Sequence, residues 1–240
     1  MNILVTGGAS GLGAAIVKHL ATGGAHTIYF TYAKSGQAAK ALEAELTNVK
    51  GFWCDFTDAA SIDSFVAQVG SLELDVLVNN ANGGLHKEHY HKTDPAVFSD
   101  SFARDVMPTL RITQEAMKGF RKKKFGKIIN IISSSVVHKP PIGWSSYIAN
   151  KSYLLAMSNV WATEGVKANI VSNCISPSYM QTAMNKDDDE RVVEMLREQH
   201  PLKKFLTIEE VAKKVAYLVK APQELTGHHI VMTAEADMPW

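Results

Sequence analysis

The 240-residue chain has few of the features that mark disulfide-rich, nucleic-acid-binding or membrane proteins. It has two cysteines, Cys54 and Cys174, too few for a disulfide framework. Its 25 Lys and Arg residues nearly balance its 24 Asp and Glu residues, so charge predicts no nucleic-acid partner. No apolar run approaches the roughly 18 residues of a membrane span. A glycine-rich turn begins at Thr6, where a signal peptide would lie. We therefore expect a cytoplasmic protein with no membrane partner.

What the chain does have is a glycine-rich turn between a short apolar run and a helical segment. Residues 3–5 predict a buried strand, and the turn that follows reads TGGASGLG over residues 6–13. Glycine tolerates positive φ and lets the backbone approach a ligand, and a helix N-terminus offers free N–H groups to a pyrophosphate. This strand–turn–helix context predicts a dinucleotide site. The contacts expected from the turn are Gly7, Ala9, Ser10, Gly11, Leu12 and Gly13.

The choice of dinucleotide depends on an acid that the sequence lacks. An NAD site usually has a carboxylate about 20 residues after the last glycine, where it binds the ribose 2′-hydroxyl. Here the end of the second predicted strand carries Tyr32, Lys34 follows, and residues 1–42 contain no Asp or Glu. Because no acid repels a 2′-phosphate, the sequence favours NADP(H), with NAD(H) as the alternative.

Apolar runs alternate with helical segments along the chain. Strands are predicted at residues 2–5, 27–32, 49–54, 76–79, 127–132, 170–175 and 229–233. Helices are predicted at residues 12–22, 37–46, 59–70, 95–122, 146–164 and 208–220. Most of the strands are continuous apolar runs, as in parallel sheets covered on both faces. The pattern predicts one α/β domain, a Rossmann-type doubly wound parallel sheet of about seven strands.

One stretch interrupts this alternation. Residues 178–205 contain a charged run at 185–190, NKDDDE, followed by an amphipathic segment. The stretch lies between the sixth strand and the last helix, at the carboxyl end of the sheet, where such folds bind ligands. We expect a substrate lid here, and the alternative is a solvated surface excursion.

Polar residues follow two of the predicted strands. Asp55 and Phe56 come directly after the third strand, and Asn79, Asn80 and Ala81 close the fourth. Because these positions lie at the carboxyl ends of parallel strands, we expect them to border an adenine and its ribose. Asp and Asn are also ordinary turn residues, so each position taken alone has a structural explanation.

Tyr147 and Lys151 lie four residues apart at the start of a predicted helix, so they share one face. A phenol has a pKa of about 10 and is a weak acid–base catalyst near neutrality, and a nearby ammonium lowers that pKa. The pair therefore predicts a proton donor or acceptor for a carbonyl/alcohol couple. Such pairs also occur by chance in many helices. Ser133 and Ser134 close the preceding strand, where a hydroxyl would hold the substrate oxygen.

Together these pieces resemble the short-chain dehydrogenase/reductase family over nearly the whole chain. The matching residues are the turn at 6–13, Asp55, Asn79, Asn80, Ala81, Asn130, Ser133, Ser134, Tyr147, Lys151, Pro177 and Thr182. The resemblance implies NAD(P)(H)-dependent hydride transfer, with Tyr147 as acid–base and Lys151 on the nicotinamide ribose. It also implies cofactor contacts at Pro177 and Thr182, and a homodimer or homotetramer formed through the two long helices at 95–122 and 146–164.

The resemblance leaves the catalytic serine open. Counting along the strand from Asn130 gives Ser133, whereas counting thirteen residues back from Tyr147 gives Ser134. We favour Ser133, because strand register varies less than loop length.

The chain departs from the family pattern near this site. Asn82 stands where the family has glycine and is followed by Gly83. Asp105 aligns with the family's helix asparagine, which supports a proton relay beside the lysine. A carboxylate at this position accepts hydrogen bonds, or it pairs with Lys151 and weakens the effect of the ammonium on Tyr147.

Our main hypothesis is an NADP(H)-dependent oxidoreductase acting on a small-molecule carbonyl or alcohol. The alternative is a cofactor-binding sensor or scaffold with little catalysis, suggested by Asp105 and the altered glycines. A narrower possibility is a 3-oxoacyl-acyl-carrier-protein reductase, because residues 201–205 resemble those enzymes and the basic run at 121–124 suits an acidic carrier protein. His86, His89 and His91 have poor spacing for metal ligands, so no metal is expected.

Overall fold

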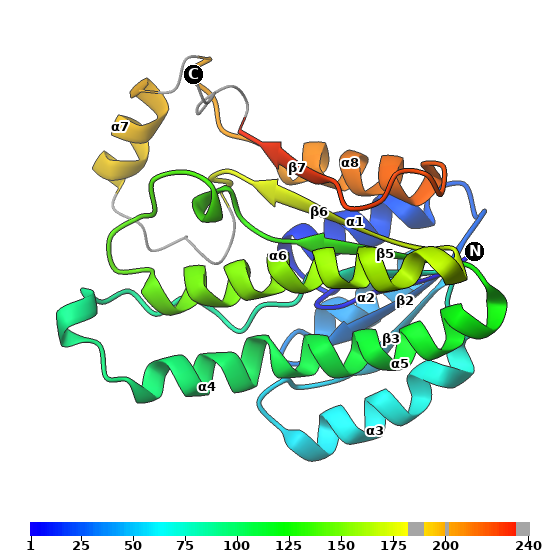
Figure 1. Ribbon diagram of the computed structural model, residues 1–240. Helices are drawn as coiled ribbons and strands as arrows, with labels where there is room; N and C mark the ends of the chain where they lie inside the picture. The colour runs from blue at the N-terminus through cyan, green and yellow to red at the C-terminus, as the bar shows by residue number, and fades with distance from the viewer. Residues whose placement is uncertain (182–189, 200–201, 234–240) are drawn as a thin grey trace.

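In this computed structural model, residues 1–181, 190–199 and 202–233 are described. Within these residues seven strands form one all-parallel sheet in the order β3-β2-β1-β4-β5-β6-β7 (Figure 1). The strands are β1 (Asn2–Val5), β2 (Thr27–Tyr32), β3 (Val49–Trp53), β4 (Val76–Asn79), β5 (Gly126–Ile131), β6 (Ile170–Pro177) and β7 (His229–Met232). The strand order reverses between β1 and β4, which is where doubly wound folds bind dinucleotides. The predicted sheet is confirmed.

Helices connect the strands. They are α1 (Gly11–Ala21), α2 (Gly36–Glu45), α3 (Ala59–Val69), α4 (Ala96–Asp105), α5 (Met107–Lys123), α6 (Ser145–Gly165), α7 (Glu190–Gln199) and α8 (Ile208–Lys220). Short 3₁₀ turns lie at Gly70–Leu72, Tyr90–Lys92, Ser134–Val136 and Val166–Ala168. In the part of the chain that is described, no helix combines the length and apolar character needed to cross a bilayer.

The single helix predicted at 95–122 is wrong, because the chain forms two helices that meet at Val106. α4 ends at Asp105, and α5 begins at Met107 with Pro108 in its first turn. Proline has no N–H to donate to the carbonyl four residues earlier, which belongs to Arg104, and its ring clashes with that carbonyl. The helix therefore ends and restarts at this point, which brings Asp105 to the end of α4.

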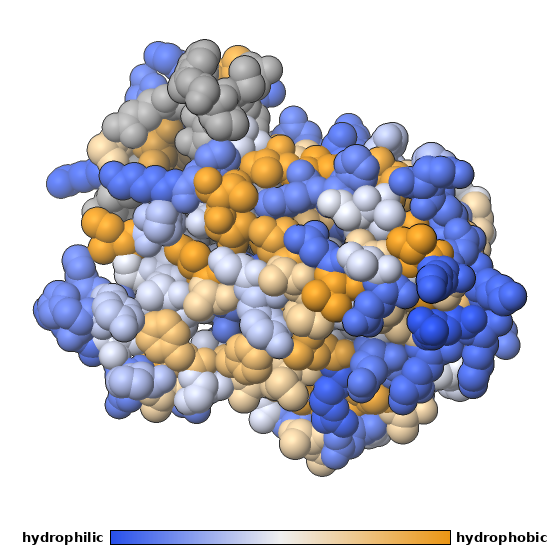
Figure 2. All heavy atoms as spheres, viewed as in Figure 1, coloured by the Kyte–Doolittle hydropathy of each residue, from blue (hydrophilic) through white to orange (hydrophobic). Residues whose placement is uncertain are grey.

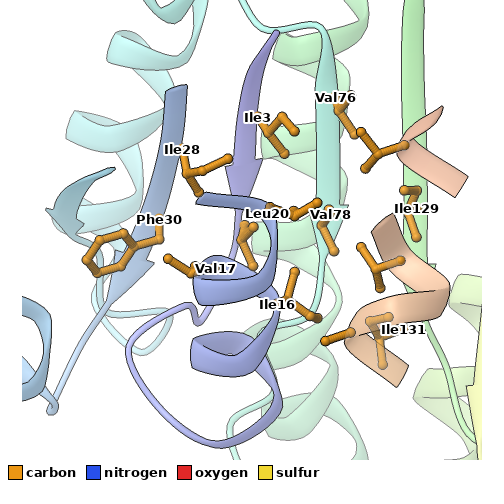
Figure 3. Close-up of a cluster of buried hydrophobic side chains, with 14 of the residues drawn as sticks. Ile3, Ile16, Val17, Leu20, Ile28, Phe30, Val76, Val78, Ile129 and Ile131 are labelled. Carbon is orange, nitrogen blue, oxygen red and sulfur yellow. The ribbon is translucent and has the colours of Figure 1, made fainter. Parts of the chain in front are cut away.

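One face of the sheet packs against α1, α2 and α8 and is almost entirely apolar. Ile3, Val78 and Ile129 point from three neighbouring strands toward Ile16 and Val17 of α1 (Figure 3). Every second residue of each strand takes part, as expected for side chains that alternate between faces. Burying this many large side chains is the main favourable contribution to folding.

The opposite face packs against α3, α5 and α6 and changes character along its length. Toward the start of the strands it is apolar, with Leu4, Leu77 and Ile128 in one cluster with helical residues such as Phe65 and Phe120. At the carboxyl ends the same face carries paired amides. Asn79 Nδ2 donates to Asn130 Oδ1 at 2.9 Å, and Asn130 Nδ2 donates to the hydroxyls of Ser158 at 3.0 Å and Ser172 at 3.3 Å.

A buried lysine fastens α8 to the sheet. Lys127 of β5 is 5% exposed, and its Nζ donates to the carbonyl of Val219 at 2.8 Å and to that of Ala221. These carbonyls lie at the C-terminus of α8, where helix carbonyls lack intrahelical partners. Burial lowers the pKa of Lys127, and the two carbonyls satisfy the ammonium within the core.

Candidate active site

The glycine turn is tied to the end of β4 by Thr6 and Asn80. Thr6 Oγ1 accepts from the backbone N–H of Asn80 at 2.9 Å and of Ala81 at 3.0 Å. Asn80 Nδ2 donates to the carbonyl of Thr6 at 2.9 Å and to that of Gly7 at 3.3 Å. The two segments lie 74 residues apart in the chain, and these four bonds make them one rigid unit. The predicted residues Gly7, Asn80 and Ala81 are thus brought together.

The glycines are required by the shape of the turn. A Cβ on Gly13 would lie 2.0 Å from the carbonyl oxygen of Gly7, so only glycine fits there. Gly7 and Gly11 have φ values of +66° and +50°, which side chains rarely adopt. A Cβ on Gly11 would meet nothing within 4 Å, so this side of the turn is open. Ser10 begins α1 without a side-chain cap, which leaves the helix N-terminus available to an anion. This cradle fits the pyrophosphate of a dinucleotide.

Residues at the ends of β2 and β3 border the same edge of the sheet. Asp55 Oδ1 accepts from the backbone N–H and the hydroxyl of Thr57, at 2.9 and 2.7 Å. These bonds, followed by the charge of Lys34, keep the pKa of Asp55 below its usual value. Tyr32 packs against Phe30 with ring centroids 6.3 Å apart, and Lys34 is exposed. The region carries a cation beside an ionised carboxylate that is already engaged in its own turn.

Tyr147, Lys151 and Ser133 converge at the carboxyl end of β5. Lys151 is 6% exposed, and its Nζ donates to the carbonyl of Ile131 at 2.8 Å. The same Nζ lies 5.8 Å from the centroid of the Tyr147 ring. The Ser133 side chain makes a hydrogen bond with Tyr147, and Ser133 Oγ also accepts from the backbone N–H of Ser135 at 3.3 Å. The geometry therefore brings Ser133 to the tyrosine, and Ser134 begins the 3₁₀ turn after it.

The expected lowering of the Tyr147 pKa is wrong for this structure. Burial raises the pKa of Tyr147, the hydrogen bond from Ser133 opposes this rise, and the charge of Asp105 adds to it. Burial also lowers the pKa of Lys151 to about 8, against a raising effect of Asp105. The spacing of Tyr147 and Lys151 indicates the nearby ammonium but not the desolvation, which disfavours both charged forms.

Asp105 lies beside this group but does not pair with Lys151. Its Oδ1 accepts from the backbone N–H of Gly83 at 2.6 Å and from Arg104 Nε at 3.1 Å, and its Oδ2 accepts from an Arg104 guanidinium nitrogen at 2.8 Å. Among the described residues, no ion pair joins Asp105 to Lys151. Of the two roles expected for the carboxylate, the structure shows hydrogen-bond acceptance.

A small hollow joins the two halves of the site. It is lined by Ala81, Asn82, Asp105, Tyr147, Asn150, Lys151 and Leu154. Ala81, in the lining of this hollow, also donates to Thr6 of the glycine turn, so the hollow lies next to the cradle. Trp144 stands edge-on to Tyr147, with ring centroids 5.6 Å apart.

Sequence reasoning missed Arg104 and Asn150, whereas Trp144 lies in the stretch 136–144 that was expected to line the substrate pocket. Only Arg104 had a signal, since it directly precedes Asp105. For two other predicted residues the structure gives only a position in the fold, and a third is not described. Pro177 is buried at the end of β6, Phe56 follows β3, and Thr182 lies outside the described residues. The described part of the chain brings no group of three His, Cys, Asp or Glu residues together as metal ligands.

The chain is similar in sequence and in structure to known proteins. Residues 1–192 match the short chain dehydrogenase family. The chain is 34% identical over 220 residues to an acetoacetyl-CoA reductase of Paracoccus denitrificans, covering 90% of this chain and 88% of the other. It is 31% identical to a 3-oxoacyl-[acyl-carrier-protein] reductase MabA of Mycobacterium avium, covering 90% and 82%. Among solved structures, a putative betaketoacyl-ACP reductase has a TM-score of 0.85 at 25% identity, with 97% and 96% of the chains covered.

Proposed function

The chain belongs to the short-chain dehydrogenase/reductase family of oxidoreductases, and we propose that it transfers a hydride between NADP(H) and a carbonyl or alcohol, with Tyr147 as acid–base. The observation that carries this proposal is the convergence of Ser133, Tyr147 and Lys151 beside the glycine cradle. A buried lysine with a lowered pKa next to a half-buried tyrosine is costly for folding, which is typical of functional sites.

The residues divide into binding and proton-transfer roles. The turn would hold the pyrophosphate through Gly7, Ala9, Ser10, Gly11, Leu12 and Gly13. The adenosine side would be bordered by Tyr32, Lys34, Asp55, Phe56, Asn79, Asn80 and Ala81, and the nicotinamide side would be held by Lys151, Pro177 and Thr182. A bound nicotinamide supplies or accepts the hydride. Tyr147 gives its hydroxyl proton to the carbonyl oxygen during reduction, Ser133 orients that oxygen, and the charge of Lys151 favours the phenolate left behind.

The preference for NADP(H) is supported by the charges around the end of β2. Lys34 is exposed just past Tyr32, where a 2′-phosphate would lie, and residues 1–42 contain no acid. Asp55, the carboxylate whose pKa the charge of Lys34 helps to lower, is tied to Thr57. A cation in this position favours a doubly charged phosphate over a neutral ribose hydroxyl.

A 3-oxoacyl thioester, carried by coenzyme A or by acyl carrier protein, is the substrate class that we propose more narrowly. The support is the activity named for two relatives, an acetoacetyl-CoA reductase and a 3-oxoacyl-[acyl-carrier-protein] reductase. Residues 178–205 would act as the lid over this substrate. The helix α7 in this stretch stands at the carboxyl edge of the sheet (Figure 1), with Met195 49% exposed. We also propose a homodimer or homotetramer.

The decisive experiment compares turnover of the wild type and Tyr147→Phe on a panel of carbonyls that includes acetoacetyl-CoA and 3-oxoacyl-carrier-protein thioesters, with NADPH and then NADH. We expect the variant to lose about 10²- to 10⁴-fold in kcat/KM while it binds NADPH as the wild type does. Ser134→Ala is the matched control for Ser133→Ala, which should lose activity. NADPH binding without Tyr147-dependent turnover would instead support the sensor, and tighter NADH binding would overturn the cofactor choice.

A further inference from the structure

The two departures from the family pattern, Asn82 and Asp105, line the same hollow. Gly83 follows Asn82, which stands where the family has glycine, and Asp105 stands where the family has asparagine. In the structure the N–H of Gly83 donates to Asp105 Oδ1 at 2.6 Å. The sequence gives no hint of this contact, because 22 residues separate the two positions.

Arg104 is the third member of this cluster. Its guanidinium donates to both carboxylate oxygens of Asp105, from Nε to Oδ1 at 3.1 Å and from Nη2 to Oδ2 at 2.8 Å. A Cβ on Gly83 would lie 2.1 Å from Arg104 Nε and 2.6 Å from Asp105 Oδ1, so the arginine lies directly over the glycine backbone. The side chain of Asp105 is 9% exposed and that of Arg104 is 30% exposed. Such a forked, largely desolvated pair is stronger and more rigid than an ion pair on the surface.

The cluster borders the reacting groups. Asp105 lines the same hollow as Tyr147 and Lys151. An unscreened carboxylate here would attract the Lys151 ammonium and oppose formation of a Tyr147 phenolate. The other titratable groups facing this cluster are Asp100 of α4, near Arg104, and Cys174 of β6, near Lys151.

We propose that Arg104 is a positioning residue for this active site: it holds and screens Asp105, so that the carboxylate anchors Gly83 without imposing its full charge on Tyr147 and Lys151. The catalytic role of this site rests on the proposed function, but the effect of Arg104 and Asp105 on the charge of Lys151 does not. In the chain, Arg104 and Gly83 each adjoin one of the two positions that depart from the family pattern, Asp105 and Asn82.

The test is an NMR titration of the Lys151 side chain in protein labelled at the lysine ε-carbon, with Lys151→Met to assign its signal. Lys151 has a pKa of about 8, so it titrates apart from ordinary lysines near 10.4. Loss of the carboxylate in Asp105→Asn should lower this pKa by about half a unit or more. Loss of the guanidinium in Arg104→Met should raise it by a similar amount.

Two controls separate charge from structure. Arg104→Lys keeps the positive charge and should stay closer to the wild type than Arg104→Met does. Arg111→Met removes an arginine that pairs with Asp63 on the surface between α5 and α3, and it should leave the titration unchanged. Shifts of the same sign in Asp105→Asn and Arg104→Met, or no shift in either, would overturn the proposal.

Failure of this proposal is distinguishable from failure of the proposed function. The titration needs neither cofactor nor substrate, so it stands even when no carbonyl is turned over. Where turnover is found, the pH–rate profile should move in the same directions, to lower pH for Asp105→Asn and to higher pH for Arg104→Met, because both changes act on Tyr147 as they act on Lys151.

Discussion

The two faces of the sheet are built from the same strands, but they differ in the side chains that they bury near the carboxyl ends. Against α1, α2 and α8 the strands are apolar almost to their carboxyl ends, and Ile129 packs there among Ile3 and Val78. One residue later, Asn130 points to the α5 and α6 face and bonds Asn79, Ser158 and Ser172. Apart from Lys127, which bonds α8, the first face supports a cradle built from backbone, whereas the second supports the ionisable side chains of the site. A backbone cradle needs only close packing, but buried charges need partners.

Gly13→Ala is expected to have the largest effect and tests the cradle on the apolar face. The new Cβ would lie 2.0 Å from the Gly7 carbonyl oxygen and 2.7 Å from Asn80 Nδ2, so the turn must move. We expect a loss of about 4 kcal/mol in the free energy of unfolding and loss of dinucleotide binding. Denaturant unfolding and NADPH titration measure these effects.

The matched control is Gly119→Ala in α5, where a Cβ meets nothing within 4 Å. It should raise stability by up to about 1 kcal/mol, because alanine is the better helix former. If Gly13→Ala folds and binds NADPH as the wild type does, close packing is not what shapes the cradle.

Lys151→Met tests the ionisable face and should act in opposite directions on activity and stability. The folded protein holds Lys151 with a pKa of about 8, whereas the unfolded chain titrates near 10.5. The unfolded state therefore binds more protons between these pH values, and wild-type stability rises with pH across this window. At pH 7 the variant should be more stable than the wild type by about 2–3 kcal/mol, with turnover lost.

This advantage of Lys151→Met should shrink as the pH rises from 8 to 10. Urea unfolding at several pH values gives the difference directly. If the difference in the free energy of unfolding between the variant and the wild type does not depend on pH, burial does not lower the pKa of Lys151 in the folded state.

Asn130→Leu should have a smaller effect and compares the faces directly. The substitution removes the acceptor of Asn79 and the donor to Ser158 and Ser172 without leaving a cavity. We expect a loss of about 2 kcal/mol, because buried polar groups then lack partners. Ile129→Val, the neighbouring change on the apolar face, should cost about 1 kcal/mol. Equal losses in urea unfolding would show that the amide network adds nothing beyond packing.

The order of strands and helices could be predicted from the sequence because each element has a local signal. Continuous apolar runs mark the strands, and every predicted strand lies within two residues of its observed bounds. The helix at 95–122 had its own counter-signal in Pro108, and that proline decides the break at Val106.

The site could be predicted only where a motif lies in one segment. The turn at 6–13 and the Tyr147–Lys151 spacing are of this kind. The contact between Gly83 and Arg104 depends on where the break leaves α4, and the raised pKa of Tyr147 depends on its burial. Neither is a property of a local pattern, so both required the structure.

The outer surface of α4, α5 and α6 carries both apolar and charged side chains. Figure 2 shows apolar side chains scattered among charged ones on the face that presents α4, α5 and α6. Met107, Tyr153 and Val160 are each at least 40% exposed on these helices. This is the face through which a homo-oligomer is expected to form, and the exposed side chains are suitable for such contacts.

Lys127 has a consequence for the order in which the elements of the fold become buried. Its ammonium is buried in β5, yet the carbonyls that accept from it belong to Val219 and Ala221, more than 90 residues later. A nascent chain that ends before α8 would hold a bare cation in the middle of its sheet. Burial of the central strand β5 is therefore coupled to docking of α8, and we expect the two elements to fold as one cooperative unit.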